Sequence, residues 1–286
     1  MKIGVSGASG NLGQAVVREL LERAQGHSVV AISRTPEKAG ASVEGRFGDY
    51  DQPESLAEAY AGLDGLLIIP TGDLRPGKRG EQNVTAIDAA VKAGVGHIVL
   101  MSSAGTREQA EPHIGASYWA GEQALIKNAP RWTILRMNYY AEALAQEAAM
   151  SLGSGALTGL AENRVAFVSR DDVGAAAAGI LLGEGHAGAI YNATGSRTYS
   201  GEQRAALVSE LAGKPVAFAA LSDEVLRGGM TQMGLPADVV NTVLSIQSEF
   251  AAGAFDIVTG DVEHLAGRPP KALRDVLASS LQGTGG

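Results

Sequence analysis

Short apolar runs alternate with longer amphipathic stretches through the first half of the chain. The runs are rich in Val, Ile and Leu, which is typical of parallel strands buried on both faces. The predicted strands are 2–5, 29–33, 43–47, 66–69, 97–101 and 132–135, and the predicted helices are 12–24, 54–61, 80–93 and 118–127. This repetition predicts an α/β fold with a Rossmann-type, doubly wound parallel sheet. Right-handed crossovers then bring the carboxyl ends of the strands to one edge.

The alternation loosens after about residue 150. Further strands are predicted at 164–167 and 189–192 with a helix at 172–182, and later helices at 200–212, 222–233, 237–252 and 271–281. We therefore expect a dinucleotide-binding domain at 1–150, completed by parts of 164–193. Residues 194–286 are expected to form a smaller, mostly helical C-terminal lobe on the substrate side.

Composition narrows the classes of partner. The 286 residues carry a net charge of −8, which disfavours a nucleic-acid surface. There is no cysteine, and the five histidines are scattered without ligand spacing, so no metal site is expected. The chain shows no targeting segment and no apolar run long enough for a bilayer, so we expect a cytoplasmic protein without a membrane partner.

A glycine-rich segment, Gly7-Ala8-Ser9-Gly10-Asn11-Leu12-Gly13, lies directly between the first predicted strand and helix. Gly7 allows a sharp turn, Gly10 leaves room for a pyrophosphate, and Gly13 lets the helix pack close to the sheet. The free N–H groups of the helix would face the phosphates. The motif predicts dinucleotide binding, with Ser9, Asn11 and Leu12 as further contacts; the alternative is an ordinary tight turn.

The second predicted strand ends in Ile32-Ser33-Arg34, where NAD-selective sites usually place an acid for the ribose 2′-hydroxyl. Arg34 stands there instead, with Lys38 one turn on, and a guanidinium suits a 2′-phosphate. The pattern favours NADP(H), with NAD(H) as the alternative cofactor and a solvated loop charge as the alternative role of Arg34. Asp49 is a candidate for the adenine amino group or, together with Asp51, for helix capping.

These residues resemble the NmrA-like branch of the atypical short-chain dehydrogenases, above all its bacterial NAD(P)H:quinone oxidoreductases and triphenylmethane reductases. The resemblance extends over most of the chain, and its matching stretches include the glycine motif, Gly48-Asp49-Tyr50, Leu135-Arg136 and Ser169-Arg170-Asp171-Asp172-Val173. It implies NADPH bound in extended form along the strand ends. By family position, Pro70 and Thr71 lie near the ribose, and Ser102 and Ser103 lie near the nicotinamide.

The expected active site departs from the typical short-chain dehydrogenases, which carry Tyr-x-x-x-Lys. No Tyr here has Lys four residues later, and the aligned stretch is Tyr118-Trp119-Ala120-Gly121-Glu122. A carboxylate one turn from the phenol disfavours phenolate, so Tyr118 is a candidate only for hydrogen bonding to a substrate carbonyl, or for packing. Glu122 is expected to be structural, bonded to backbone. Electron-poor acceptors such as quinones need a well-placed hydride donor more than an acid, so the missing lysine favours them.

The expected substrate wall follows the sixth strand and comprises Met137, Asn138, Tyr139 and Tyr140. Tyr140 could stack on a flat aromatic or quinoid molecule. The leading function is reduction of a quinone or similar planar acceptor by NADPH. The alternatives are a tailoring oxidoreductase of aromatic secondary metabolism and a non-catalytic NADP(H) sensor of the NmrA type. A homodimer is left open.

Overall fold

The computed structural model describes residues 1–23, 25–39 and 43–282. Ala24, expected as the last residue of the first helix, lies outside the described residues. Within these ranges, no helix combines the length and apolar character needed to cross a membrane. The described residues divide into two compact units, those within 1–137, 170–193 and 261–268 in the first, and those within 138–169, 194–260 and 269–282 in the second.

The first unit is built on a seven-stranded parallel sheet, which confirms the Rossmann-type prediction. Its order is β3-β2-β1-β4-β5-β6-β9. The strands are β1 Lys2–Ser6, β2 Ser28–Ser33, β3 Glu44–Phe47, β4 Gly65–Ile68, β5 His97–Ser103, β6 Trp132–Met137 and β9 Ala189–Ala193. The strand order reverses between β1 and β4, and ligands of doubly wound sheets bind at the carboxyl ends of the strands at this switch point.

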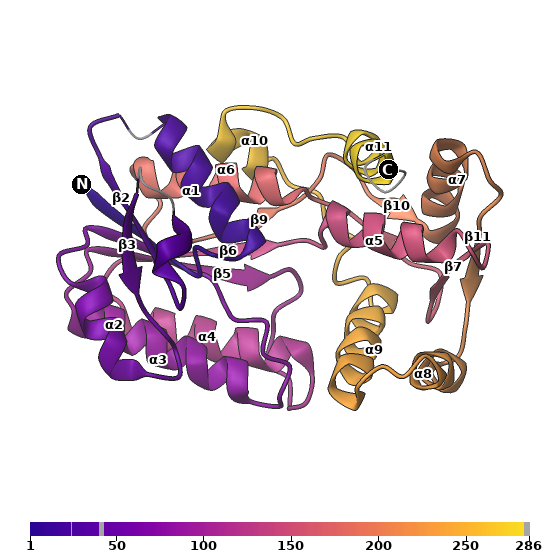
Figure 1. The fold of residues 1–286 in the computed structure, drawn as a ribbon, viewed down its shortest axis with the longest axis horizontal. Helices are drawn as coiled ribbons and strands as arrows, with labels where there is room; N and C mark the ends of the chain where they lie inside the picture. Colours follow the sequence, from indigo (N-terminus) through magenta and orange to yellow (C-terminus); the bar gives the residue numbers. More distant parts are fainter. Residues whose placement is uncertain (24, 40–42, 283–286) are drawn as a thin grey trace. The chain divides into compact units, whose positions relative to one another are not determined.

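Helices cover both faces of this sheet (Figure 1). One face carries α1 Asn11–Arg23, α6 Arg170–Leu182 and α10 Asp261–Ala266; the other carries α2 Pro53–Tyr60, α3 Lys78–Lys92 and α4 Ile114–Asn128. The short 3-10 helix η1 spans Pro36–Ala39. Fully buried side chains between α2, α3, α4 and the sheet include Ile32, Leu56, Tyr60, Leu66 and Ile98. Apolar residues on both faces of the strands therefore form the expected two cores.

Small residues allow α6 to pack closely on its neighbours. Residues 175–178 of this helix are all alanine and fully buried. A Cβ added at Gly174 would lie 3.1 Å from the backbone of Ala15 in α1, and one added at Gly179 would lie 2.0 Å from the backbone oxygen of Leu265 in α10. The backbones are thus in direct contact, and segment 261–268 belongs to the first unit although it is distant in sequence.

The second unit contains most of the later helices and two small sheets. Its helices are α5 Ala141–Ser151, α7 Gly201–Ala212, α8 Asp223–Gln232, α9 Ala237–Ala251 and α11 Leu273–Gln282. β8 Arg164–Val165 pairs antiparallel with β10 Tyr199–Ser200, and β7 Ala156–Gly159 pairs parallel with β11 Ala217–Ala220. The ring of Tyr139 packs edge-on against Phe167, Phe250 and Phe255.

This unit differs in detail from the sequence prediction. The lobe was expected at 194–286 and the first domain up to residue 150, but the second unit also includes residues 138–169, whose helix α5 packs on α11 and β7. The predicted strand at 164–167 forms ladder pairs only at 164–165. Helix α5 and the strands β7 and β11 were not predicted; α5 is rich in alanine, which gives little contrast between a buried and an exposed face.

Candidate functional site

A cavity of about 590 Å³ lies at the carboxyl ends of the strands where the sheet order reverses. It is lined by residues of the loop after β1, the ends of β2 and β3, and the loop after β4. All of these segments belong to the first unit. Of the cofactor residues expected from the sequence, the lining includes Gly7, Ser9, Gly10, Asn11, Leu12, Gly13, Arg34, Asp49, Pro70 and Thr71.

The glycine loop forms a tight turn onto α1. Gly7 has a φ of +92°, which favours glycine, and its N–H donates to the carbonyl of Ile32 at 3.0 Å. A Cβ at Gly13 would lie only 2.2 Å from the oxygen of Gly7, whereas one at Gly10 would meet only that oxygen, at 3.5 Å. Gly13 is therefore needed for packing, while Gly10 keeps the cavity wall free of a side chain. The first turn of α1 also lines the cavity, so its positive dipole end faces this space.

Arg34 follows β2, is exposed and lines the cavity. Lys38 lies in η1, is also exposed, and does not line the cavity. Asp49 lines the cavity, and its carboxylate accepts hydrogen bonds from the backbone N–H of Asp51 and from Gln52 Nε2 at 3.1 and 3.2 Å. The alternative of helix capping by Asp49 and Asp51 is wrong: the N-cap of α2 is Gln52, which makes no side-chain capping bond.

Tyr50 and Ser6 line the cavity, and Tyr60 is fully buried next to Ser6. Tyr50 Oη lies 2.9 Å from Ser6 Oγ and 3.1 Å from the carbonyl of Ile69, and Ser6 Oγ lies 3.1 Å from Tyr60 Oη. Burial raises the pKa of both phenols well above their ordinary value, so they stay neutral. These bonds join the loop after β3 to β1 and β4. None of these three residues was expected at the cavity from the sequence, although Tyr50 belongs to a stretch that matches the family.

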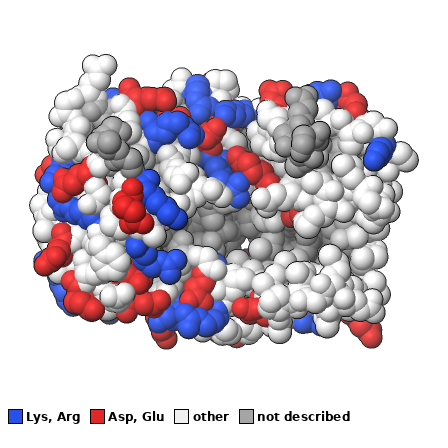
Figure 2. All heavy atoms as spheres, viewed as in Figure 1, with Lys and Arg blue, Asp and Glu red and all other residues white. Residues whose placement is uncertain are grey.

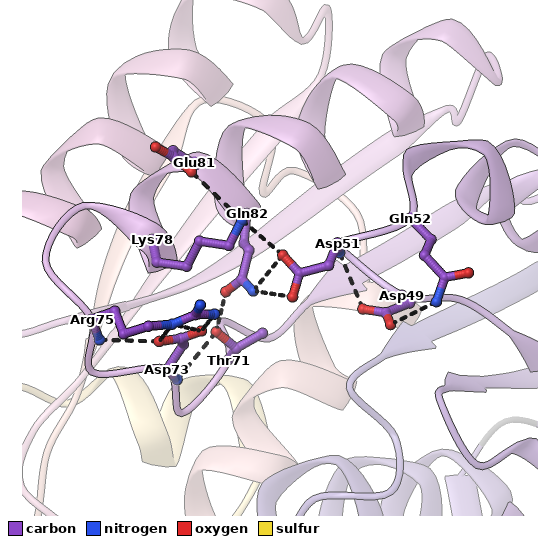
Figure 3. Close-up of polar contacts among 9 residues, drawn as sticks. All are labelled: Asp49, Asp51, Gln52, Thr71, Asp73, Arg75, Lys78, Glu81 and Gln82. Carbon is purple, nitrogen blue, oxygen red and sulfur yellow. Dashed lines mark hydrogen bonds and ion pairs between the residues drawn. The ribbon is translucent and has the colours of Figure 1, made fainter.

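A polar chain lies along the wall formed by Thr71 (Figure 3). Gln82 of α3 accepts a hydrogen bond from Thr71 and donates to Asp51, which also pairs with Lys78 at 2.9 Å. The bonds from Lys78 and Gln82 hold the pKa of the Asp51 carboxyl below its ordinary value. The adjacent Asp73 pairs with Arg75, which lowers the pKa of the Asp73 carboxyl to about 2. Sequence reasoning missed this chain, because its members are separated by up to 31 residues.

The ends of β5 and β6 carry a second polar cluster. Glu122 of α4, 1% exposed, accepts from Ser102 Oγ at 2.6 Å and from Arg136 Nε and Nη2 at 2.9 and 2.7 Å. The expectation that Glu122 bonds to backbone is wrong, since these partners are side chains. The carboxylate at the position of the usual lysine is thus neutralised by an arginine from β6.

Tyr118 lies one turn before Glu122 and is buried. The guanidinium of Arg79 lies over its ring, 5.4 Å from the centroid. Ser103 is half-buried at the end of β5. Tyr118, Ser102 and Ser103 do not line the 590 Å³ cavity, so their expected roles toward nicotinamide and substrate stay predictions.

The expected substrate wall spans the boundary of the two units. Met137 ends β6 in the first unit, and the next three residues begin the second. Asn138 is 1% exposed; its Nδ2 donates to the carbonyl of Phe255 and its Oδ1 accepts from the N–H of Tyr139. Tyr139 donates its hydroxyl to Glu147, and Tyr140 is half-buried at the start of α5. A substrate role for these four residues stays a prediction.

The cavity fits a dinucleotide. A loop without side chains at Gly10, the amino end of α1 and the exposed guanidinium of Arg34 together favour an anionic ligand with several phosphates. On the face drawn in Figure 2, basic side chains of the first unit lie among acidic ones. In residues 1–23, 25–39 and 43–282, no group of three or more His, Cys, Asp or Glu side chains could hold a metal ion.

Comparisons with known proteins agree with this assignment. The chain is 28% identical over 280 residues to an NAD(P)H azoreductase of Xenophilus azovorans, covering 95% of each chain. Its fold matches the Citrobacter triphenylmethane reductase complexed with NADP(H) at a TM-score of 0.88 and 29% identity, covering 97% of this chain and 99% of that one. It matches the NADPH complex of a quinone oxidoreductase from Escherichia coli at a TM-score of 0.90 and 27% identity, covering 98% and 99%.

These similarities confirm the family resemblance expected from the sequence. The model of one family, described as NAD(P)H-binding, matches residues 7–183, which include the glycine loop, Arg34, Asp49 and Thr71. The chain belongs to this NAD(P)H-binding family.

Proposed function

We propose that the protein is an NADPH-dependent reductase that transfers hydride to a quinone or a similar planar, electron-poor acceptor. The observation that carries the proposal is the cavity at the switch point of the sheet, where Gly10 leaves the wall without a side chain and Arg34 lines the edge. The relatives are named for quinone, azo and triphenylmethane reduction, and all three acceptor classes are conjugated and electron-poor.

The charges around Tyr118 support this class of acceptor. In the usual short-chain dehydrogenase arrangement a lysine one turn after the tyrosine assists proton exchange, but here that position holds Glu122, paired with Arg136. Reduction of a simple ketone gives a strongly basic alkoxide that benefits from such assistance. A quinone gives an aromatic hydroquinone anion, and a cationic dye becomes neutral, so both depend mainly on correct placement of the hydride.

Within this proposal the residues have separate tasks. Gly10 and the start of α1 hold the pyrophosphate, Arg34 binds the 2′-phosphate with Lys38 nearby, and Asp49 binds the adenine amino group. Ser102 and Ser103 lie near the nicotinamide, and Tyr118 donates a neutral hydrogen bond to the acceptor. Met137, Asn138, Tyr139 and Tyr140 form the acceptor side. Residence in the cytoplasm and a homodimer stay predictions.

The test is to mix purified protein with NADPH and a panel of quinones, azo compounds and cationic dyes, and to follow the absorbance of the reduced nicotinamide. We expect turnover with at least one class. The matched control is Gly10→Val, whose side chain enters the cavity beside the pyrophosphate position; it should fold but neither bind nor oxidise NADPH. Tight NADPH binding without any turnover would contradict the reductase proposal and favour a cofactor sensor.

A further inference from the structure

Hydrogen bonds connect Thr71, in the wall of the cavity, to two segments that are distant in sequence (Figure 3). Thr71 follows β4, Gln82 lies in α3, and Asp51 lies in the loop before α2. Thr71 Oγ1 lies 2.5 Å from Gln82 Oε1, and Gln82 Nε2 lies 3.1 Å from each carboxylate oxygen of Asp51. Thr71, Asp51 and Gln82 all line the cavity, and Gln82 is only 4% exposed.

The direction of each hydrogen bond in this chain follows from chemistry. Lys78 and Gln82 hold the pKa of the Asp51 carboxyl below its ordinary value, so at neutral pH its two oxygens are ionised and can only accept. The amide group facing them must therefore be the NH₂ of Gln82, and its oxygen must face Thr71. An amide oxygen only accepts, so the hydroxyl proton of Thr71 is donated to Gln82.

This direction decides what Thr71 can offer to a ligand. Its single hydroxyl proton is donated to Gln82, and its Oγ1 accepts a hydrogen bond from the backbone N–H of Asp73 at 3.3 Å. One acceptor position of the hydroxyl is left for a ligand in the cavity. The sugar hydroxyls of a dinucleotide are hydrogen-bond donors, whereas its ionised phosphates are not. Thr71 therefore favours a sugar hydroxyl over a phosphate oxygen at this wall.

We infer that Gln82 and Asp51 are positioning residues that fix the Thr71 hydroxyl as a hydrogen-bond acceptor for a ribose hydroxyl of the cofactor. Neither side chain needs to touch the ribose, because both act through Thr71. The inference rests on the proposed dinucleotide in this cavity. The same contacts join the loop after β3 to the loop after β4, so the positioning depends on both segments.

The test is a double-mutant cycle on NADPH binding, measured by calorimetry or nicotinamide fluorescence without an acceptor. Thr71→Val removes the acceptor, and Gln82→Met keeps the length of the side chain but removes both bonds. Each single variant is expected to weaken NADPH binding up to about tenfold, the size of one net hydrogen bond. Because Gln82 acts through Thr71, the double variant should lose no more than Thr71→Val alone. Independent losses that multiply toward a hundredfold would overturn the inference.

A second variant guards against unfolding of the buried Gln82 position. Asp51 is less buried than Gln82, so Asp51→Asn is less disruptive. The Asn amide can donate as well as accept, so the Gln82 amide can rotate by 180° and present its NH₂ to Thr71. Thr71 then no longer has to donate its hydroxyl proton to Gln82. Asp51→Asn should weaken NADPH binding several-fold in the natural chain and not at all when Val replaces Thr71. The control is Glu81→Gln on the same helix, whose side chain is 72% exposed and makes no contact with Thr71; binding should be unchanged.

The outcomes separate this inference from the proposed function. Coupled binding losses without turnover on any acceptor would keep the positioning role and remove the reductase. Turnover with uncoupled binding losses would keep the reductase and remove the positioning role. A natural chain that does not bind NADPH would overturn both.

Discussion

Arg34 is the residue on which the choice between the two dinucleotides depends. It is exposed at the edge of the cavity and follows β2, where NAD-selective sites place an acid. We expect Arg34→Ala to raise the Kd for NADPH roughly ten- to hundredfold, since charge-assisted hydrogen bonds contribute about 1.5–3 kcal/mol. The Kd for NADH should change little. Arg131→Ala, an exposed arginine before the amino end of β6, is the control; equal losses for both cofactors would contradict the role of Arg34.

Asp73 gives the cavity rim a defined response to pH. Its pairing with Arg75 lowers its pKa from 3.8 to about 2 in the folded protein. Because the folded-state pKa is the lower one, the pair stabilises the fold above the unfolded value and loses that contribution as the pH falls through about 2. Asp73→Asn should therefore lower the melting temperature by a constant amount at neutral pH, and the difference should shrink below about pH 4. A carboxyl titration by NMR with a midpoint near 3.8 would speak against this pairing.

At the scale of elements, the close contact of α6 with α10 leads to a prediction about stability. A Cβ at Gly179 would lie 2.0 Å from the oxygen of Leu265, so Gly179→Ala should destabilise the protein by about 1–3 kcal/mol through overpacking. Gly228 in α8 is the matched control, since a Cβ there meets nothing within 4 Å. Gly228→Ala should stabilise by about 0.5–1 kcal/mol, as alanine favours helix. Free energies of unfolding from urea titration test the pair, and equal signs would contradict the packing argument.

The sequence predicted elements well where periodicity was strong. The six strands predicted between residues 2 and 135 and the four helices between them are all present, because most of them have a clear apolar pattern; β3, with the sequence Glu-Gly-Arg-Phe, does not. Helix α10 was missed, since six residues are too few to show a period. The glycine loop and Arg34 were found because they lie at fixed offsets from a strand. The contact between Gln82 and Asp51 was not predicted, because it forms only when α3 packs beside the loop after β3.

At the scale of the whole molecule, the first unit needs distant parts of the chain. A fragment ending at residue 150 would lack β9, which pairs with β6, and α6, which packs on α1. An edge of the sheet and the part of one face that α6 covers would then be exposed, which favours aggregation. We expect fragment 1–150 to be insoluble or to melt without a cooperative transition in circular dichroism. Cooperative melting together with NADPH binding by this fragment would show that the later segments are dispensable.

The chain passes between the two units at residues 137–138, 169–170, 193–194, 260–261 and 268–269. A single crossover between two genes therefore cannot exchange one unit and keep the other intact. Point substitutions and short insertions leave these five connections intact, so they can change the second unit without rebuilding the first. The interlaced connectivity therefore means that the two units are inherited together.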